Sequence, residues 1–296
     1  MRSQHSRTRS WAAAALACAV LAASACTSDD EAPAQVDASQ VEAVPASAVD
    51  VESRAEVGLP SGTLSLGLAP ELATVSTSAG SLTPGSDVTM LGLTWSFEPH
   101  PSSDARDALL DGQDLESLPP PSVALIDGAV PVPVPVVAQA GASGGVVMGV
   151  TDPARIEVEY DGLIQTVDLD TGAVGAGQAE GLTDLSDATT TVLRPCPARD
   201  FPPAAVLDHG CRVEEVHLLP YIDGRGWAPD SQTWLVVDAR IDGDATMLLG
   251  DDPGTLLDGA PPAVQRVAFA VAGNSPRTID FDFGPPIGAV SVPLAS

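Results

Sequence analysis

The chain has 296 residues, a formal net charge of −27 and a sequence pI near 4.1. All 13 basic residues are arginines, because the sequence contains no lysine. The acidic excess repels phosphate backbones and excludes nucleic acid as a partner. The missing lysine excludes P-loop, Schiff-base and Ser-x-x-Lys chemistry.

The first 25 residues are typical of an export signal. Residues 1–10 contain Arg2, Arg7 and Arg9 but no acid, and an unbroken apolar run follows over 11–23. This run is shorter than the roughly 20 residues that a membrane-spanning helix needs, and no later segment reaches that length. We expect residues 1–25 to be cleaved as a signal peptide, which changes the net charge from −27 to −30.

Cys26 directly follows the small residues 23–25 and precedes a polar stretch over 27–31. This arrangement resembles the lipobox of bacterial membrane lipoproteins, and the resemblance covers the N-terminus alone. It implies lipidation of Cys26, with palmitate as an acyl group, and a location at the extracytoplasmic face of the cell membrane. Lipoboxes usually have Leu three positions before the cysteine, where this chain has Ala23. The same Ala-x-Ala pattern suits ordinary signal peptidase, so a secreted protein is the alternative.

Residues 26–60 consist mainly of Ala, Val, Ser, Pro and acidic residues, without an aromatic side chain. Such a segment buries too little apolar surface to offset the entropy of ordering. Its acids face a single arginine, Arg54, so self-repulsion would extend the chain. We predict a disordered acidic tether over 26–60 that holds the folded part away from the membrane.

From Ser61 onward, short runs of β-branched residues alternate with Gly, Pro and Asp-Gly pairs, a pattern typical of strands and tight turns. Residues 155–160 and 278–283 alternate apolar and polar side chains, which predicts strands with one buried face. The one convincing helical segment is 103–110, with Ser102 or Ser103 as its N-cap. The sequence therefore predicts an all-β fold.

The two alternating strands belong to an internal repeat. Residues 153–169 align without a gap with residues 276–292, and upstream matches follow in the same order with changed spacing. Those upstream matches are 125–129 with 256–260, and Thr94-Trp95 with Thr233-Trp234.

Repeats of about 100 residues with several short strands predict tandem antiparallel β-sandwich domains. We expect two related domains over 61–177 and 189–296, joined by a linker over 178–188. Their strand pattern, clearest over 234–241, resembles the immunoglobulin-like and telokin-like domains of bacterial surface lipoproteins. The resemblance is to a strand pattern and implies no binding residue.

Cys196 and Cys211 form the obvious disulfide pair, because Cys18 leaves with the signal peptide and Cys26 is the lipidation site. Two buried thiols are the alternative. In an oxidising compartment, closing a loop of about 15 residues would stabilise the fold by roughly 3 kcal/mol.

The second predicted domain also contains the residues with the best potential for recognition. Tyr221, Arg225 and Trp227 share a Gly-rich loop, and His209 and His217 lie nearby in sequence. Such residue types anchor protein partners or stack on sugars. We predict a binding surface here for an envelope protein or a glycan, although Trp227 could instead fold back over the end of the sandwich.

Catalytic and metal-binding patterns are weak. Residues 141–145 fit Gly-x-Ser-x-Gly around Ser143, but a strand rather than a helix is expected to follow. A hydrolase that uses Ser143 or the Asp208/His209 region is one alternative function. A calcium-stabilised surface adhesin is another, because the chain is rich in acidic pairs, although none forms a calcium loop. We expect no metal site and no cofactor.

Together these features predict an exported, lipid-anchored cell-envelope protein. Because no catalytic constellation is found, we expect it to act as a non-catalytic binding or scaffold module through its second sandwich.

Overall fold

The computed structural model describes residues 33–296, apart from residues 112, 187, 197–209, 243–244, 259–263, 273–277, 286–288 and 295–296 and the side chains of residues 116, 242 and 258. In this part, 58% of residues lie in strands and 7% in helices, so the predicted all-β fold is confirmed. Residues 33–296 form one compact unit. The division into two domains stays a prediction.

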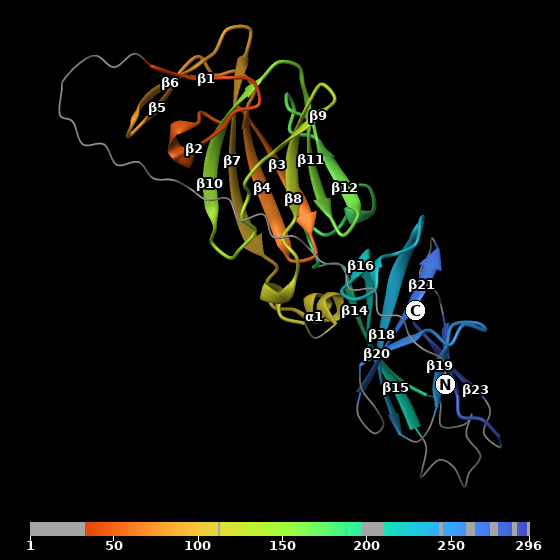
Figure 1. The fold of residues 1–296 in the computed structure, drawn as a ribbon. Coiled ribbons are helices and arrows are strands. Elements are labelled where there is room, and N and C mark those ends of the chain that lie inside the picture. The colour runs from red at the N-terminus through yellow and green to blue at the C-terminus, as the bar shows by residue number, and fades with distance from the viewer. Residues whose placement is uncertain are drawn as a thin grey trace, which may run out of the picture. The chain divides into compact units, whose positions relative to one another are not determined.

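Two five-stranded sheets form the first sandwich (Figure 1). Sheet I has the order β2-β10-β7-β4-β3, and sheet II has the order β13-β12-β11-β8-β9. Apolar side chains from both sheets, including Leu66, Leu93, Ile156 and Val158, pack in one buried cluster. The strands of sheet I are β2 (Val41–Val44), β3 (Ser53–Leu59), β4 (Gly62–Ala69), β7 (Thr89–Pro99) and β10 (Ser143–Val150). Those of sheet II are β8 (Ser122–Asp127), β9 (Val130–Pro133), β11 (Pro153–Tyr160), β12 (Leu163–Val167) and β13 (Val174–Gly175).

A second sandwich follows in the chain. Sheet III has the order β14-β15-β18-β21-β20, and sheet IV has the order β19-β22-β23. Their facing side chains form a second cluster that includes Val237, Phe269, Ile279 and Phe281. The strands of sheet III are β14 (Thr189–Pro195), β15 (Gly210–Leu219), β18 (Gln232–Asp242), β20 (Thr255–Asp258) and β21 (Val264–Ala272). Those of sheet IV are β19 (Thr246–Leu248), β22 (Thr278–Asp282) and β23 (Ala289–Pro293).

Smaller elements complete the fold. A three-stranded sheet has the order β1-β6-β5, and the two-stranded sheet β16-β17 is a hairpin. The strands are β1 (Ala34–Val36), β5 (Val75–Thr77), β6 (Gly80–Pro84), β16 (Tyr221–Ile222) and β17 (Gly226–Trp227). The short helices are η1 (Ala46–Ala48), α1 (Asp104–Leu110), η2 (Leu115–Ser117) and η3 (Gly177–Ala179).

The predicted helix and both alternating strands are present. In α1 the Ser103 side chain accepts a hydrogen bond from the Arg106 backbone N–H at 3.2 Å, which satisfies one free donor of the first turn. In β11 the alternating residues Ile156 and Val158 are fully buried, as are Ile279 and Phe281 in β22. These local predictions are confirmed because each pattern coincides with a single buried face.

The two sandwiches share a strand order. Strands β3-β4-β7-β10 are successive neighbours in sheet I, as β14-β15-β18-β21 are in sheet III. The β11–β12 hairpin lies beside β8, and the β22–β23 hairpin lies beside β19. Trp95 and Trp234 lie on the corresponding strands β7 and β18. The internal repeat in the sequence thus has a counterpart in the topology.

The repeat is not exact in two places. Ile156 pairs with Val167, whereas Ile279 pairs with Val292, two residues beyond the position that the alignment indicates. The predicted match of 125–129 with 256–260 is wrong, because the two segments do not occupy corresponding positions in the two sandwiches. Strand β8 belongs to sheet II, but β20 lies at the edge of sheet III and pairs with β21. In sheet III, β20 instead occupies the edge position beside β21 that β2 has beside β10 in sheet I.

The predicted disordered tether is wrong for residues 33–60. This segment contains β1, β2 and β3, and β3 pairs along its whole length with β4. Val57 and Leu59 are fully buried. The segment can be ordered despite its composition, because strands β4 and β10 supply the backbone partners and apolar surface that it lacks by itself. The first sandwich therefore begins well before Ser61, and residues 26–32 lie outside the described part.

Candidate functional site

The predicted binding surface of the second sandwich centres on the β16–β17 hairpin. Tyr221 is buried, and its ring contacts those of Tyr160 and Trp227 with centroids 5.7 and 5.1 Å apart. Trp227 donates its indole N–H to the Tyr160 carbonyl at 3.0 Å. These aromatic residues therefore pack inside the molecule, as in the alternative interpretation of Trp227.

The other residues of that predicted surface are separated. Arg225 at the turn of the hairpin is exposed and donates to the Leu256 carbonyl at 3.5 Å. His217 is fully buried on β15. His209 lies outside the described residues. Of this set, Arg225 is the exposed side chain and Trp227 is partly exposed.

The aromatic packing predicts an altered tyrosine titration. The chain has only two tyrosines, Tyr160 and Tyr221. Burial raises the pKa of Tyr160 to about 12, and burial also raises that of Tyr221. At pH 11 we expect little tyrosinate absorbance near 295 nm from the folded protein, and about nine-tenths of the full absorbance in urea, where both phenols titrate near 10.

The sign of this shift links it to stability. The fold favours the neutral phenol, so its contribution is complete below pH 10 and is lost as the pH rises through about 12. A folded protein whose tyrosines both titrate near 10 would contradict the buried packing of Tyr160 and Tyr221.

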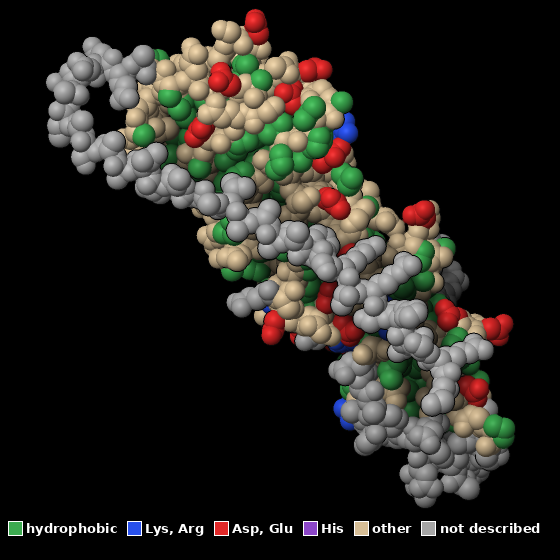
Figure 2. All heavy atoms as spheres, viewed as in Figure 1, with side chains coloured by type: hydrophobic (Ala, Val, Ile, Leu, Met, Phe, Trp, Pro, Cys, Tyr) green, Lys and Arg blue, Asp and Glu red, His purple; other side chains and the backbone are tan. Residues whose placement is uncertain are grey.

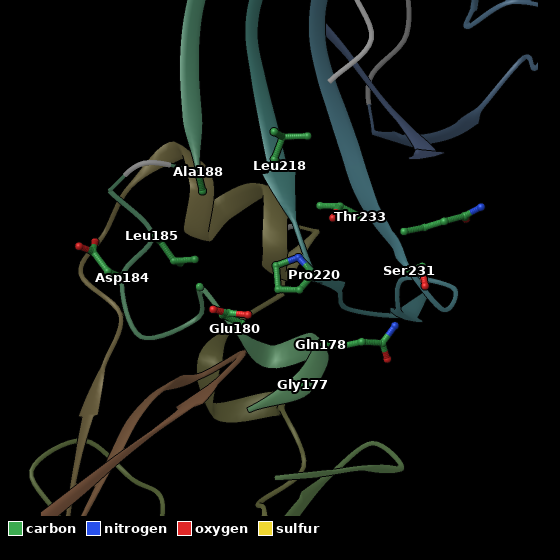
Figure 3. A pocket seen from close by; sticks show the side chains of 12 residues that line it. Gly177, Gln178, Glu180, Asp184, Leu185, Ala188, Leu218, Pro220, Ser231 and Thr233 are labelled. Atoms are coloured by element: carbon green, nitrogen blue, oxygen red, sulfur yellow. The ribbon is translucent and has the colours of Figure 1, made fainter. Parts of the chain in front are cut away.

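A groove lies beside this hairpin (Figure 3). Its volume is about 470 Å³, and it separates the segment 177–188 from the ends of β15 and β18. Gln178 on its wall donates to the Ala228 carbonyl at 2.7 Å, which ties this segment to the residue after the hairpin. We name it the linker groove; its lining residues are Gly177, Gln178, Glu180, Gly181, Asp184, Leu185, Ala188, Leu218, Pro220, Ser231, Gln232 and Thr233.

The linker groove is acidic and partly apolar. Glu180 and Asp184 are exposed carboxylates, while Leu185 and Leu218 supply apolar surface from opposite sides. Hydrogen bonds from Ser186 lower the pKa of Asp184, which favours its ionised form. Figure 2 shows that acidic side chains are also spread over the visible face, with few arginines. The groove therefore suits a partner with a cationic and an apolar group.

A cluster of charged side chains lies on the face of sheet III turned away from sheet IV. Glu215 and His217 alternate on β15, Asp238 lies on β18 and Arg266 on β21. Glu215 and Arg266 are the direct cross-strand neighbours of Asp238, because a bulge between Val213 and Glu215 adjusts the register. We name these four residues the charge cluster.

Hydrogen bonds hold the charge cluster in place. Arg266 binds both carboxylate oxygens of Asp238, at 2.8 and 2.7 Å. Burial raises the pKa of Asp238, but the hydrogen bonds and charge of Arg266, together with the nearby His217 imidazole, outweigh it and hold that pKa at about 2. Burial, together with the carboxylate of Asp104, raises the pKa of Glu215. His217 Nδ1 lies 2.9 Å from the Thr189 hydroxyl.

Three ligand-type side chains meet in this cluster. One carboxylate oxygen each from Glu215 and Asp238, and a ring nitrogen of His217, lie within 4.8 Å of one another. His217 Nε2 is 3.9 Å from Glu215 and 3.6 Å from Asp238, beyond hydrogen-bond range. It is buried and has no hydrogen-bond partner. Nitrogen and carboxylate donors in this arrangement can hold a divalent metal ion.

Of the residues named for the hydrolase alternative, the structure describes Ser143 alone. Ser143 is the first residue of β10, and more of that strand follows rather than the helix of a nucleophile elbow. The first motif glycine, Gly141, has a left-handed backbone with φ of 73°, which favours glycine, and a side chain at the second, Gly145, would crowd the backbone of Ala46. His100 is buried with Nε2 2.9 Å from the Leu59 carbonyl oxygen, and Asp208 and His209 lie outside the described residues.

Three acids of the pairs behind the calcium alternative serve local turns, whereas Asp280 on β22 accepts a hydrogen bond from the Ser291 hydroxyl on β23. Asp168 accepts hydrogen bonds from the backbone and hydroxyl of Thr171. Asp252 and Asp282 each accept from the backbone N–H of a following glycine, at 2.9 and 2.8 Å. Asp242-Gly243-Asp244 lies largely outside the described residues. These contacts explain the three acids as turn residues.

The predicted disulfide between Cys196 and Cys211 is present, with Cα atoms 5.2 Å apart. It connects β15 to the residue after β14. The predicted signal peptide and Cys26 lie outside the described residues. In the part of the chain that is described, no helix has the length and apolarity to cross a membrane.

No protein-family model matches the chain, and neither a curated protein nor a solved structure matches it. The chemistry of its own residues is therefore the basis for a functional proposal.

Proposed function

We propose that the protein is exported, is held by a lipid on Cys26 at the extracytoplasmic face of the cell membrane, and binds an envelope partner without catalysing a reaction. The partner is a protein segment that carries basic and apolar side chains, and it binds in the linker groove. The observation that supports this proposal is the groove itself, with the exposed acids Glu180 and Asp184 and apolar surface from Leu185 and Leu218.

Two features favour recognition over chemistry. The groove contains Glu180 and Asp184, and among its described lining residues no histidine, cysteine or arginine could complete a catalytic pair with them. Arg225 stands exposed on the neighbouring hairpin, where it could contact an acidic group of the same partner. Steering by a strongly acidic surface would favour the encounter with a basic partner.

The binding half of the proposal is tested by affinity capture from detergent-solubilised membranes with the intact anchored protein. Glu180→Arg reverses a charge in the groove, so we expect at least a tenfold lower recovery of the specific partner. Arg225→Ala should lower recovery to a smaller extent. Trp227 is a poor choice, because its replacement would disturb the packing of Tyr221.

The matched control is Glu71→Arg, which makes the same charge change at an exposed loop residue far along the chain. Its recovery should equal that of the unaltered protein. If Glu180→Arg and Arg225→Ala recovered as much partner as the unaltered protein, the groove would be overturned as the binding site. Capture that survives protease treatment of the membranes would identify a glycan instead of a protein.

The anchoring half is tested at Cys26. We expect Cys26→Ala to move the protein from the membrane fraction to the medium, because the thiol that carries the lipid is gone. Intact-mass analysis of the unaltered mature protein should find an acylated Cys26 at its N-terminus. An unacylated protein already present in the medium would establish the secreted alternative.

A further inference from the structure

We propose that Glu215, His217 and Asp238 bind a zinc ion in the charge cluster. Each residue would supply one ligand atom, from two neighbouring strands of sheet III, and a water molecule would take the fourth position. The site is distinct from the linker groove, so it is independent of the proposed partner.

The unpartnered nitrogen of His217 is the observation that points to a ligand. His217 is fully buried, and its Nε2 is aimed between two carboxylates without hydrogen bonding to either. An Nε2 lone pair facing two carboxylates is repulsive, and an Nε2–H here would be a buried donor whose facing carboxylate oxygens, at 3.6 and 3.9 Å, lie beyond hydrogen-bond range. A cation between the three groups removes both problems.

The distances suit zinc. Zinc binds histidine nitrogen and carboxylate oxygen at about 2.0–2.2 Å, which puts two ligand atoms roughly 3.4 Å apart at a tetrahedral angle. The two nitrogen-to-oxygen distances of 3.6 and 3.9 Å are within about half an ångström of this value. Calcium prefers six to eight oxygen ligands and would gain little from an imidazole.

The neighbours of the three ligands orient them. Thr189 Oγ1 lies 2.9 Å from His217 Nδ1, so it can accept a hydrogen bond from Nδ1–H, which leaves the Nε2 lone pair for the metal. Arg266, on the neighbouring strand β21, holds the Asp238 carboxylate in place with two hydrogen bonds. Each carboxylate oxygen has two lone pairs, so Asp238 can bind both Arg266 and a metal ion.

The test is a titration of the chelator-treated exported protein with zinc chloride, followed by calorimetry. We expect one zinc ion per chain at micromolar affinity or tighter, and a melting temperature that rises with the zinc concentration because zinc binds the folded state. X-ray absorption of the loaded protein should give a nitrogen and oxygen shell near 2.0 Å without sulfur, since Cys196 and Cys211 are joined.

Two variants identify the ligands. His217→Gln should weaken zinc binding at least a hundredfold, and Glu215→Gln at least tenfold. Because Glu215 is partly exposed, its amide variant keeps the shape of the site and should fold, as circular dichroism would verify. The matched control is Glu214→Gln on the adjacent residue, whose carboxylate pairs with Arg212 and Arg240 instead.

Absence of stoichiometric zinc uptake by the unaltered protein would overturn the proposal. Zinc affinity that is unchanged in Glu215→Gln would also overturn it, because the ion would then bind at another surface site. Sulfur in the zinc coordination shell measured by X-ray absorption would overturn it as well. If Glu214→Gln and Glu215→Gln lost the same amount of zinc affinity, the effect would come from surface charge rather than from ligand binding. That result would overturn the site as well.

Discussion

Leu59→Ala is expected to lower the free energy of unfolding of the first sandwich by about 3 kcal/mol, since it leaves a cavity in a packed core. Leu59 is fully buried at the end of β3, in the cluster between sheets I and II. A loss of this size is a large part of the stability of an ordinary domain. Urea denaturation of the mature protein, followed by tryptophan fluorescence, measures it.

The matched control is Glu56→Ala on the same strand. Glu56 is exposed, so its replacement should change the free energy of unfolding by less than about 0.5 kcal/mol. If residues 26–60 formed a disordered tether, both substitutions would leave the unfolding curve unchanged. Equal curves for Leu59→Ala and the unaltered protein would therefore contradict the position of β3 in the core.

The segment 33–60 shows where a prediction of disorder from amino-acid composition fails. Its lack of aromatic residues and its acids predict disorder for an isolated chain, and this inference concerns local content alone. In the fold, β3 pairs with β4 and β2 pairs with β10, a strand more than a hundred residues away in sequence. Alanine and valine suffice for burial at edge strands when larger side chains come from the neighbours.

Local periodicity was more informative. The alternation over 155–160 and 278–283 predicts both the strands and their buried faces, because a sandwich buries every second residue of a strand. The cap at Ser103 predicts the start of α1 because its hydroxyl satisfies a backbone donor within one turn. The extent and pairing of each strand depend on partners distant in sequence, so the repeat alignment fails at β20.

The charge cluster could be predicted only in part. Glu215 and His217 are two residues apart on a strand, so alternation alone puts them on one face. Asp238 interrupts an otherwise apolar run over 234–239, which is a second indication of a special position. Their meeting with Arg266 depends on the register of three strands and on the bulge before Glu215, which the sequence does not encode in a recognisable motif.

The Arg266–Asp238 pair is expected to be the most important ion pair of sheet III. Its two side chains are largely buried, with 20% and 11% exposed, and the bond is bidentate. Arg266→Met removes the partner of a buried carboxylate, so the free energy of unfolding should fall by about 3 kcal/mol. The measurement is urea denaturation at pH 7 with chelator present, which separates this effect from any bound metal.

Two comparisons decide whether this loss reflects an uncompensated charge. Arg266→Met combined with Asp238→Leu should recover most of the stability, because replacing both partners of a buried pair by apolar residues is often neutral. Arg212→Ala breaks an exposed pair with Glu214 and should cost less than about 1 kcal/mol. If Arg266→Met were as mild as Arg212→Ala, Asp238 would be solvated, and the charge cluster would not be the closed site that its burial indicates.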